Sequence, residues 1–242
     1  MKKFLRSLFA VAFCLISASN AAVRDTISIG TCADFPPFEF FKDGQLTGFD
    51  VELIKLIAAK IGRKVEFKDM PFGSLIVSIQ TGAIDCIISG LNISEEKKKI
   101  VDFSKEYYTA KMALVYRNDN PVISLEQVAK KKVACQLGTS GHEKKIKEAA
   151  PEADIQLMDT FNQAIEALKA GHVDCVFMDE APSKEFCSKN PELGYNIAAE
   201  YDEGGYAIAV VKGSTLLEPI NKALEDPQLK EEIEKLKLKY GI

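Results

Sequence analysis

An acidic residue follows a strand-like apolar run in the second half of the chain. Asp179 comes directly after residues 173–178, and this run has the composition of a strand buried in a parallel sheet. Ligands of α/β sheets bind at the carboxyl ends of the strands, so the Asp179 side chain is predicted to face a ligand cleft. The same residue could equally cap the helix expected to begin near residues 181–182.

The segment Gly138-Thr139-Ser140 opens a predicted helix over residues 140–150. The first turn of a helix has free backbone N–H groups and the positive end of the helix dipole, so it suits an anion such as a carboxylate. Ser140 is also a good N-cap, and the two roles are compatible.

Several other candidates have ordinary structural interpretations when they are taken alone. Lys97 lies in a basic run after Ser94-Glu95-Glu96, which is typical of a solvated helix start. Isolated phenylalanines are usually core residues. A strand followed by small polar residues is usually an ordinary turn. These interpretations cover Lys97, Phe35, Phe72, Ser89, Gly90 and Asn92.

The sequence does not indicate a metal or cofactor site. It has no C-x-x-C, H-E-x-x-H, G-x-S-x-G or P-loop pattern, and no Gly-rich dinucleotide turn follows a strand. The histidines, His142 and His172, do not share a spacing typical of metal ligands. His142 is predicted to be an exposed residue in the first turn of the helix over residues 140–150.

Composition excludes several classes of protein. The 242 residues are 47% hydrophobic and 27% charged, as in globular proteins, and the net charge of −4 provides no basic surface for a nucleic acid. Residues 1–22 have the form of a cleaved export signal, with Lys2, Lys3 and Arg6 before a short apolar stretch and small residues at 19–22. We therefore expect an exported, periplasmic protein whose fold starts near residue 23.

Five cysteines remain after the predicted signal, so one at least is unpaired in a monomer. Cys86, Cys135 and Cys175 lie inside apolar, strand-like runs, where a thiol behaves as a small hydrophobic group. We expect buried free thiols rather than a disulfide framework.

The chain has two similar halves. In the first, strand-like residues 27–31, 65–67 and 84–88 alternate with helical patterns, and residues 133–136, 155–158 and 173–177 repeat the order in the second. The segment after Gly82 matches the segment after Gly171. This pattern predicts two βαβ-type lobes with a ligand cleft between them.

The motifs resemble those of the family 3 periplasmic solute-binding proteins, which are the polar amino-acid receptors of ABC importers. The similar segments span nearly the whole mature chain: residues 30–39, 48–53, 72–76, 84–94, 101–104 with 107–108, 136–139, 171–174 and 207–213. The resemblance implies an α/β, two-lobed Venus-flytrap fold of type II with a mixed, mostly parallel sheet in each lobe. It places lobe 1 at residues 23–110 and 206–242, lobe 2 at 113–198, and hinge crossings at 109–112 and 199–205.

The same resemblance assigns roles to the candidate residues. Asp179 becomes the counter-ion of the ligand ammonium, assisted by Ser89, Gly90 and Asn92. Gly138, Thr139 and Ser140 would hold the ligand carboxylate together with Lys97, which occupies the place of a family arginine. Phe35 and Phe72 would sandwich the ligand side chain. An ammonium group lacks the planar two-pronged fork of arginine, so the carboxylate would be held less rigidly, or the ligand would not be a standard α-amino acid.

Cys32 occupies a position where receptors for basic ligands often have an acidic residue. This departure favours an uncharged polar or sulfur-containing amino acid, although Asp34 or Glu39 could substitute, so arginine and histidine stay open. The expected partners are the amino acid and the membrane permease, and the expected state is a monomer. A cyclohexadienyl dehydratase-like enzyme, with Glu39 or His142 as general acid, and a receptor for a membrane signalling protein are the alternatives on the same fold.

Overall fold

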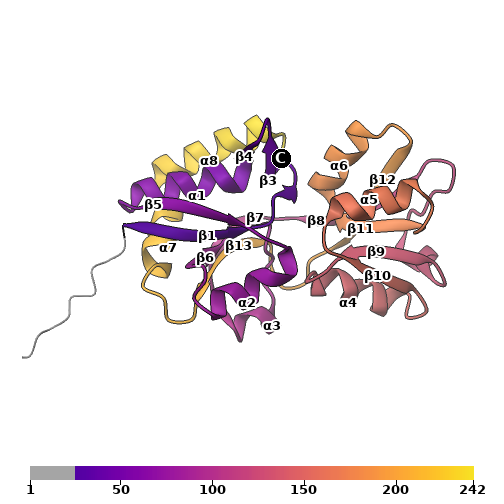
Figure 1. The fold of residues 1–242 in the computed structure, drawn as a ribbon, viewed down its shortest axis with the longest axis horizontal. Helices are drawn as coiled ribbons and strands as arrows, with labels where there is room; N and C mark the ends of the chain where they lie inside the picture. Colours follow the sequence, from indigo (N-terminus) through magenta and orange to yellow (C-terminus); the bar gives the residue numbers. More distant parts are fainter. Residues whose placement is uncertain (1–24) are drawn as a thin grey trace, which may run out of the picture.

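The computed structural model describes residues 25–242, and the predicted signal at residues 1–22 lies outside this range (Figure 1). Two lobes are visible, each built on its own five-stranded sheet. Within residues 25–242, no helix combines the length and hydropathy needed to cross a membrane.

The sheet of lobe 1 has the strand order β5-β1-β6-β13-β7. β1 pairs in parallel with β5 and β6, whereas β13 runs antiparallel to β6 and β7. Only β13 is therefore reversed, and this strand comes from the C-terminal part of the chain. The strands are β1 (Thr26–Thr31), β5 (Lys64–Asp69), β6 (Cys86–Ile87), β7 (Val101–Tyr108) and β13 (Tyr206–Val211).

Helices and a small hairpin sheet complete lobe 1. The helical elements are α1 (Phe49–Lys60), η1 (Phe72–Ser74), α2 (Leu75–Gln80), α3 (Glu95–Lys98), α7 (Leu217–Glu225) and α8 (Pro227–Tyr240). The small sheet consists of β2 (Asp34–Phe35), β3 (Glu39–Lys42) and β4 (Gln45–Thr47). α8 has strong end signals, because Asp226 accepts hydrogen bonds from the backbone of Gln228 and Leu229, and Gly241 adopts the left-handed conformation.

The sheet of lobe 2 has the order β10-β9-β11-β8-β12, in which β8 is the reversed strand. Its strands are β8 (Lys111–Arg117), β9 (Lys132–Gln136), β10 (Asp154–Met158), β11 (Cys175–Asp179) and β12 (Leu193–Glu200). Its helical elements are η2 (Leu125–Val128), α4 (Ser140–Ala149), α5 (Phe161–Lys169) and α6 (Glu180–Lys189).

The two halves share a detail that the repeated sequence reflects. Asp85, just before β6, accepts a hydrogen bond from the backbone N–H of Ser28, and Asp174, just before β11, accepts one from Lys132. Each distance is 2.8 Å. The aspartate before the cysteine thus ties its strand to the neighbouring parallel strand in both lobes. β6 is shorter than the predicted strand over residues 84–88.

Two segments join the sheets. β7 continues into β8 through residues 109–110, and β12 continues into β13 through residues 201–205 (Figure 1). The predicted hinge limits, 109–112 and 199–205, extend into β8 and β12. The two crossings remain a prediction for the hinge between the lobes.

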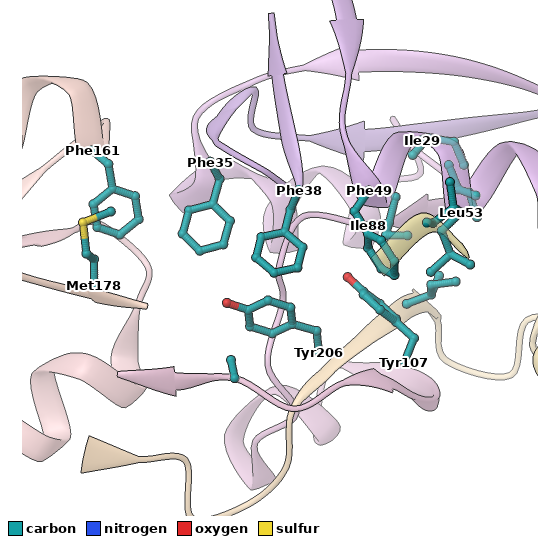
Figure 2. Packing of buried hydrophobic residues seen from close by; sticks show 14 of the residues in the cluster. Ile29, Phe35, Phe38, Phe49, Leu53, Ile88, Tyr107, Phe161, Met178 and Tyr206 are labelled. Carbon is teal, nitrogen blue, oxygen red and sulfur yellow. The ribbon is translucent and has the colours of Figure 1, made fainter. Parts of the chain in front are cut away.

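One hydrophobic cluster extends across both lobes. Phe35 and Phe38 of lobe 1 pack towards Phe161 and Met178 of lobe 2, with Tyr206 beside them (Figure 2). Two smaller clusters lie within single lobes. The described cysteines, Cys32, Cys86, Cys135, Cys175 and Cys187, are free thiols.

Candidate functional site

A small buried cavity lies between the lobes. Its volume is about 20 Å³, close to the space that one water molecule needs. An amino acid is much larger than this volume. Most of the predicted site residues line this cavity: Cys32, Asp34, Phe35, Phe72, Ser89, Gly90, Asn92, Thr139 and Asp179.

Asp179, the last residue of β11, is 3% exposed and has three hydrogen-bond donors. Oδ1 accepts from the Tyr201 hydroxyl at 2.8 Å and from His142 Nε2 at 3.2 Å, and Oδ2 accepts from the Tyr206 hydroxyl. The residue occupies the N-cap position of α6, but its side chain makes no capping hydrogen bond. A carboxylate has about four acceptor positions, so an ammonium group can join these donors.

The prediction for His142 is wrong, because this residue is 2% exposed. His142 and Ile146 lie four residues apart on one face of α4, and both are buried. The imidazole ring packs edge-on against Phe177, with 5.1 Å between the ring centroids. Because the Asp179 carboxylate only accepts, the hydrogen bond between them places the proton on Nε2 of His142.

A pair of carboxyl groups lies buried in lobe 1. Glu39 Oε1 accepts from the Ser89 hydroxyl at 2.9 Å, and Asp50 Oδ2 accepts from the Gly90 N–H at 2.9 Å and the Tyr107 hydroxyl at 2.7 Å. Burial raises the pKa of Asp50 to about 6, and burial with the nearby Asp50 charge raises the pKa of Glu39 well above its usual value. Glu39 Oε2 and Asp50 Oδ1 are both buried without a hydrogen-bond partner. One proton shared by the two carboxyl groups would satisfy both of these oxygens.

Asp34 joins the lobes. Its Oδ2 accepts from the backbone N–H of Phe161 at 2.7 Å, and Gln136 Nε2 lies 3.3 and 3.2 Å from the two carboxylate oxygens. The Cys32 thiol donates to Oδ1 at 3.2 Å. Burial raises the pKa of Asp34 and that of Cys32, so the thiol is neutral at physiological pH.

Aromatic rings form part of the cavity wall. Phe35 lies between Phe38 and Phe161, with centroid distances of 5.7 and 5.6 Å, and Phe72 lines the cavity from η1 (Figure 2). Gly90 leaves room for the Phe35 ring, because a Cβ at residue 90 would lie 2.6 Å from its Cε1 atom. The backbone at Gly90, with φ of 53°, also favours glycine.

Lys97 does not line the cavity. It is buried, and its Nζ donates to the backbone oxygen of Asn92 at 3.2 Å and to Asn92 Oδ1 at 2.5 Å. Burial lowers the pKa of Lys97 to about 8, against the opposing effect of the Asp179 charge. Lys97 thus positions Asn92, which does line the cavity.

The predicted anion site at the start of α4 has a different cap. Thr139 is the N-cap residue and Ser140 the first residue of the helix, and the Thr139 hydroxyl donates to the Gln136 backbone at 2.6 Å. Ser140 lines a larger groove of about 520 Å³ beside the crossing at residues 201–205, among charged side chains. Gly138 allows the lobes to approach, since a Cβ there would lie 2.9 Å from the Gly73 Cα.

Comparison with known proteins identifies the fold and the lineage. The model of the bacterial extracellular solute-binding proteins, family 3, matches residues 27–242. The chain belongs to this family. The expected two-lobed α/β fold is thereby confirmed, since a solved ancestral arginine-binding protein bound to arginine superposes with a TM-score of 0.84 at 41% identity, covering 90% of this chain and 98% of that one.

Other relatives of this solute-binding protein have related names. An arginine-binding extracellular protein of Bacillus subtilis is 36% identical, with 99% of this chain and 98% of the relative covered. A probable histidine-binding protein of Campylobacter jejuni is 32% identical, with 93% of each chain covered. A solved ancestral arginine-binding protein bound to glutamine has a TM-score of 0.84 at 42% identity, covering 90% of this chain and 98% of that one. These are names of binding proteins, not of dehydratases.

The structure brings further residues of this solute-binding protein to the cavity: Glu39, Gln136, His142, Phe161 and Tyr201. Gln136 ends β9, and Phe161 begins α5, so both occupy the edge where α/β sheets bind ligands. The position at a strand end that predicts Asp179 as a site residue therefore also indicates these two residues. Tyr201 has no comparable signal, because it lies in the crossing between the sheets.

Proposed function

We propose that this solute-binding protein closes on a cationic amino acid, arginine before all others, and delivers it to the permease of an ABC importer. One observation carries the proposal: Glu39 and Asp179 are buried carboxyl groups at one cavity, and no lysine or arginine lines that cavity among residues 25–242. Buried charges need partners of opposite sign, so this lining favours a ligand with two cationic groups.

Each group of such a ligand has a partner in the proposed complex. Asp179 accepts from the α-ammonium group, in addition to its protein donors. Asn92, held by Lys97, and the backbone at the start of α4 bind the α-carboxylate. Glu39 receives the guanidinium and gives up the proton that it shares with Asp50.

The acidic lining changes the ligand preference that Cys32 alone suggests. The neutral thiol supplies no charge, but Glu39 comes from the same lobe and lines the same cavity. The arginine-binding relatives support this preference. Glutamine is the neutral alternative that the ancestral structure suggests.

The proposed setting is the periplasm, reached through a signal at residues 1–22 that is cleaved on export. The proposed movement is a hinge opening at the two crossings, with ligand favouring the closed state that the permease recognises. The proposed state in solution is a monomer.

A thermal-shift screen of refolded protein tests the function. The panel contains arginine, ornithine, lysine, histidine, citrulline, glutamine, cystine and prephenate, with mass spectrometry on the prephenate sample. Binding to the folded state raises Tm, so arginine is expected to give the largest shift. A larger shift with citrulline or glutamine contradicts the cationic preference, and conversion of prephenate to phenylpyruvate contradicts the receptor function.

A further inference from the structure

The Asp34 carboxylate of lobe 1 has its two strongest donors in lobe 2. We infer that Asp34 is a closure latch and not a ligand contact: its carboxylate binds the N-terminus of α5 and the Gln136 amide, and thereby holds the lobes together around any ligand. The inference rests on the proposed function only in assuming that the lobes open and close around a ligand.

The latch contacts are short and buried. The Phe161 N–H donates to Oδ2 of Asp34 at 2.7 Å, and Gln136 Nε2 spans both carboxylate oxygens at 3.3 and 3.2 Å. Asp34 is 7% exposed, Gln136 2% and Phe161 1%. Beside these polar contacts, the Phe35 ring of lobe 1 stacks on the Phe161 ring of lobe 2 at 5.6 Å (Figure 2).

The start of α5 is arranged to receive a carboxylate. The hydroxyl of Thr160, the N-cap residue, accepts from the Gln163 N–H, so the Phe161 N–H stays available to a group from outside the helix. The positive end of the dipole of this nine-residue helix adds to the attraction. Gln136 is held in turn by its bond to the Asp159 backbone at 3.2 Å, so both donors are fixed within lobe 2.

The same contacts argue against a direct role for Asp34 in binding a ligand cation. Oδ2 has the Phe161 and Gln136 donors, and Oδ1 has the Gln136 and Cys32 donors. These donors occupy most of the roughly four acceptor positions of a carboxylate. Glu39 Oε2 has no hydrogen-bond partner and Glu39 lines the cavity, so Glu39 is the acidic group of lobe 1 that a ligand can engage.

A latch between the lobes acts on the rate at which they open. In the open form water can replace Asp34 as the partner of Phe161 and Gln136. In a closed Asp34→Ala variant the Phe161 N–H is buried without an acceptor, and Gln136 Nε2 keeps only the Asp159 backbone oxygen and the Cys32 sulfur. We therefore expect this variant to raise the dissociation rate constant about tenfold, with little change in the association rate constant. The effect should be equal for arginine and glutamine, because the ligand does not touch the latch.

Stopped-flow binding of arginine and glutamine and small-angle X-ray scattering of the ligand-free protein test the inference together. Asp34→Asn keeps one oxygen for the Phe161 N–H, so its dissociation rate constant should lie between those of the wild type and Asp34→Ala. Asp69→Ala is the matched control, because Asp69 is an exposed carboxylate of the same lobe that accepts from the Ala33 N–H at 2.9 Å. Wild type and the control should give the same rates and the same radius of gyration, and Asp34→Ala a larger radius.

Two outcomes overturn the latch. If Asp34→Ala weakens the binding of arginine and leaves that of glutamine unchanged, Asp34 is a direct partner of the ligand cation. An unchanged radius of gyration together with unchanged rates shows that the contact does not stabilise the closed form. If the wild-type protein binds neither amino acid, the proposed function fails, but scattering of the ligand-free variants still decides the latch.

Discussion

The two lobes present their carboxyl groups to the cavity in different ways. In lobe 1, Glu39 and Asp50 find their partners within the lobe, at Ser89, Gly90 and Tyr107. In lobe 2, His142 is the one donor to the Asp179 carboxylate that comes from the same lobe, among the described residues.

The other two donors to Asp179 are Tyr201 in the crossing and Tyr206 in lobe 1. The surroundings of Glu39 are thus complete within lobe 1, whereas those of Asp34 and Asp179 need groups from both lobes. This difference predicts that lobe 1 selects the ligand side chain and that Asp179 couples binding to closure.

The largest expected effect is at Asp179. Asp179→Asn should weaken the binding of arginine and glutamine alike, by about 3–5 kcal/mol, because a buried ammonium would lose its charged partner. Isothermal titration calorimetry measures both ligands. Asp174→Asn is the control, since Asp174 lies before the same strand and holds the Lys132 N–H instead. Wild-type affinity in Asp179→Asn would remove this residue from the site.

Glu39→Gln should separate the two ligands. We expect the binding of arginine to weaken by about 1.5–3 kcal/mol, the usual range for a hydrogen bond to a charged group, and the binding of glutamine to change little. Competition of each amino acid against a common labelled ligand gives the ratio directly, with the exposed Glu66→Gln as control. An equal loss for both would place selection outside lobe 1.

The shared proton of Glu39 and Asp50 predicts an effect of pH that depends on the ligand. A guanidinium favours the ionised pair, and burial raises the pKa of both carboxyls, that of Asp50 to about 6. Arginine affinity should therefore fall as pH decreases, because Glu39 then holds its proton more tightly, and it should fall further below about 6, where Asp50 also gains a proton, while glutamine affinity stays nearly level. Titrations in buffers of different ionisation enthalpy should also show proton release with arginine alone. Equal pH profiles for the two ligands would contradict the shared proton.

The smallest effect is expected at Lys97, which acts through Asn92. Lys97→Met should weaken binding by about 1 kcal/mol, and Lys97→Arg should retain it, as judged by calorimetry at pH 7. Because burial lowers the pKa of Lys97 to about 8, wild-type affinity should decrease above pH 8. Affinity of the Lys97→Met variant should not decrease above pH 8 for this reason, because methionine does not titrate. Identical affinities for the Met variant and the wild type would make Lys97 a purely structural residue.

The fold could be predicted from the sequence because its signals are local and repeated. Buried strands, helix ends at Gly62 and Gly171, and the two Asp-Cys strand starts each depend on neighbouring residues. Asp179 could be placed at the site by the same logic, because it follows its strand directly.

The remaining features depend on contacts between distant residues. The inward face of α4 buries His142 against β11, although its first turn is polar in sequence. The contacts of Asp34 with Phe161 and Gln136 span 127 and 102 residues, and they form only where two lobes meet. Local patterns contain no information about such contacts.

Calorimetric titration of the refolded protein with arginine, followed by the same titration with glutamine, tests the central claim most directly. One arginine should bind per chain, and more tightly than glutamine at pH 7. Tighter binding of glutamine, or no heat of binding with either amino acid, would contradict it.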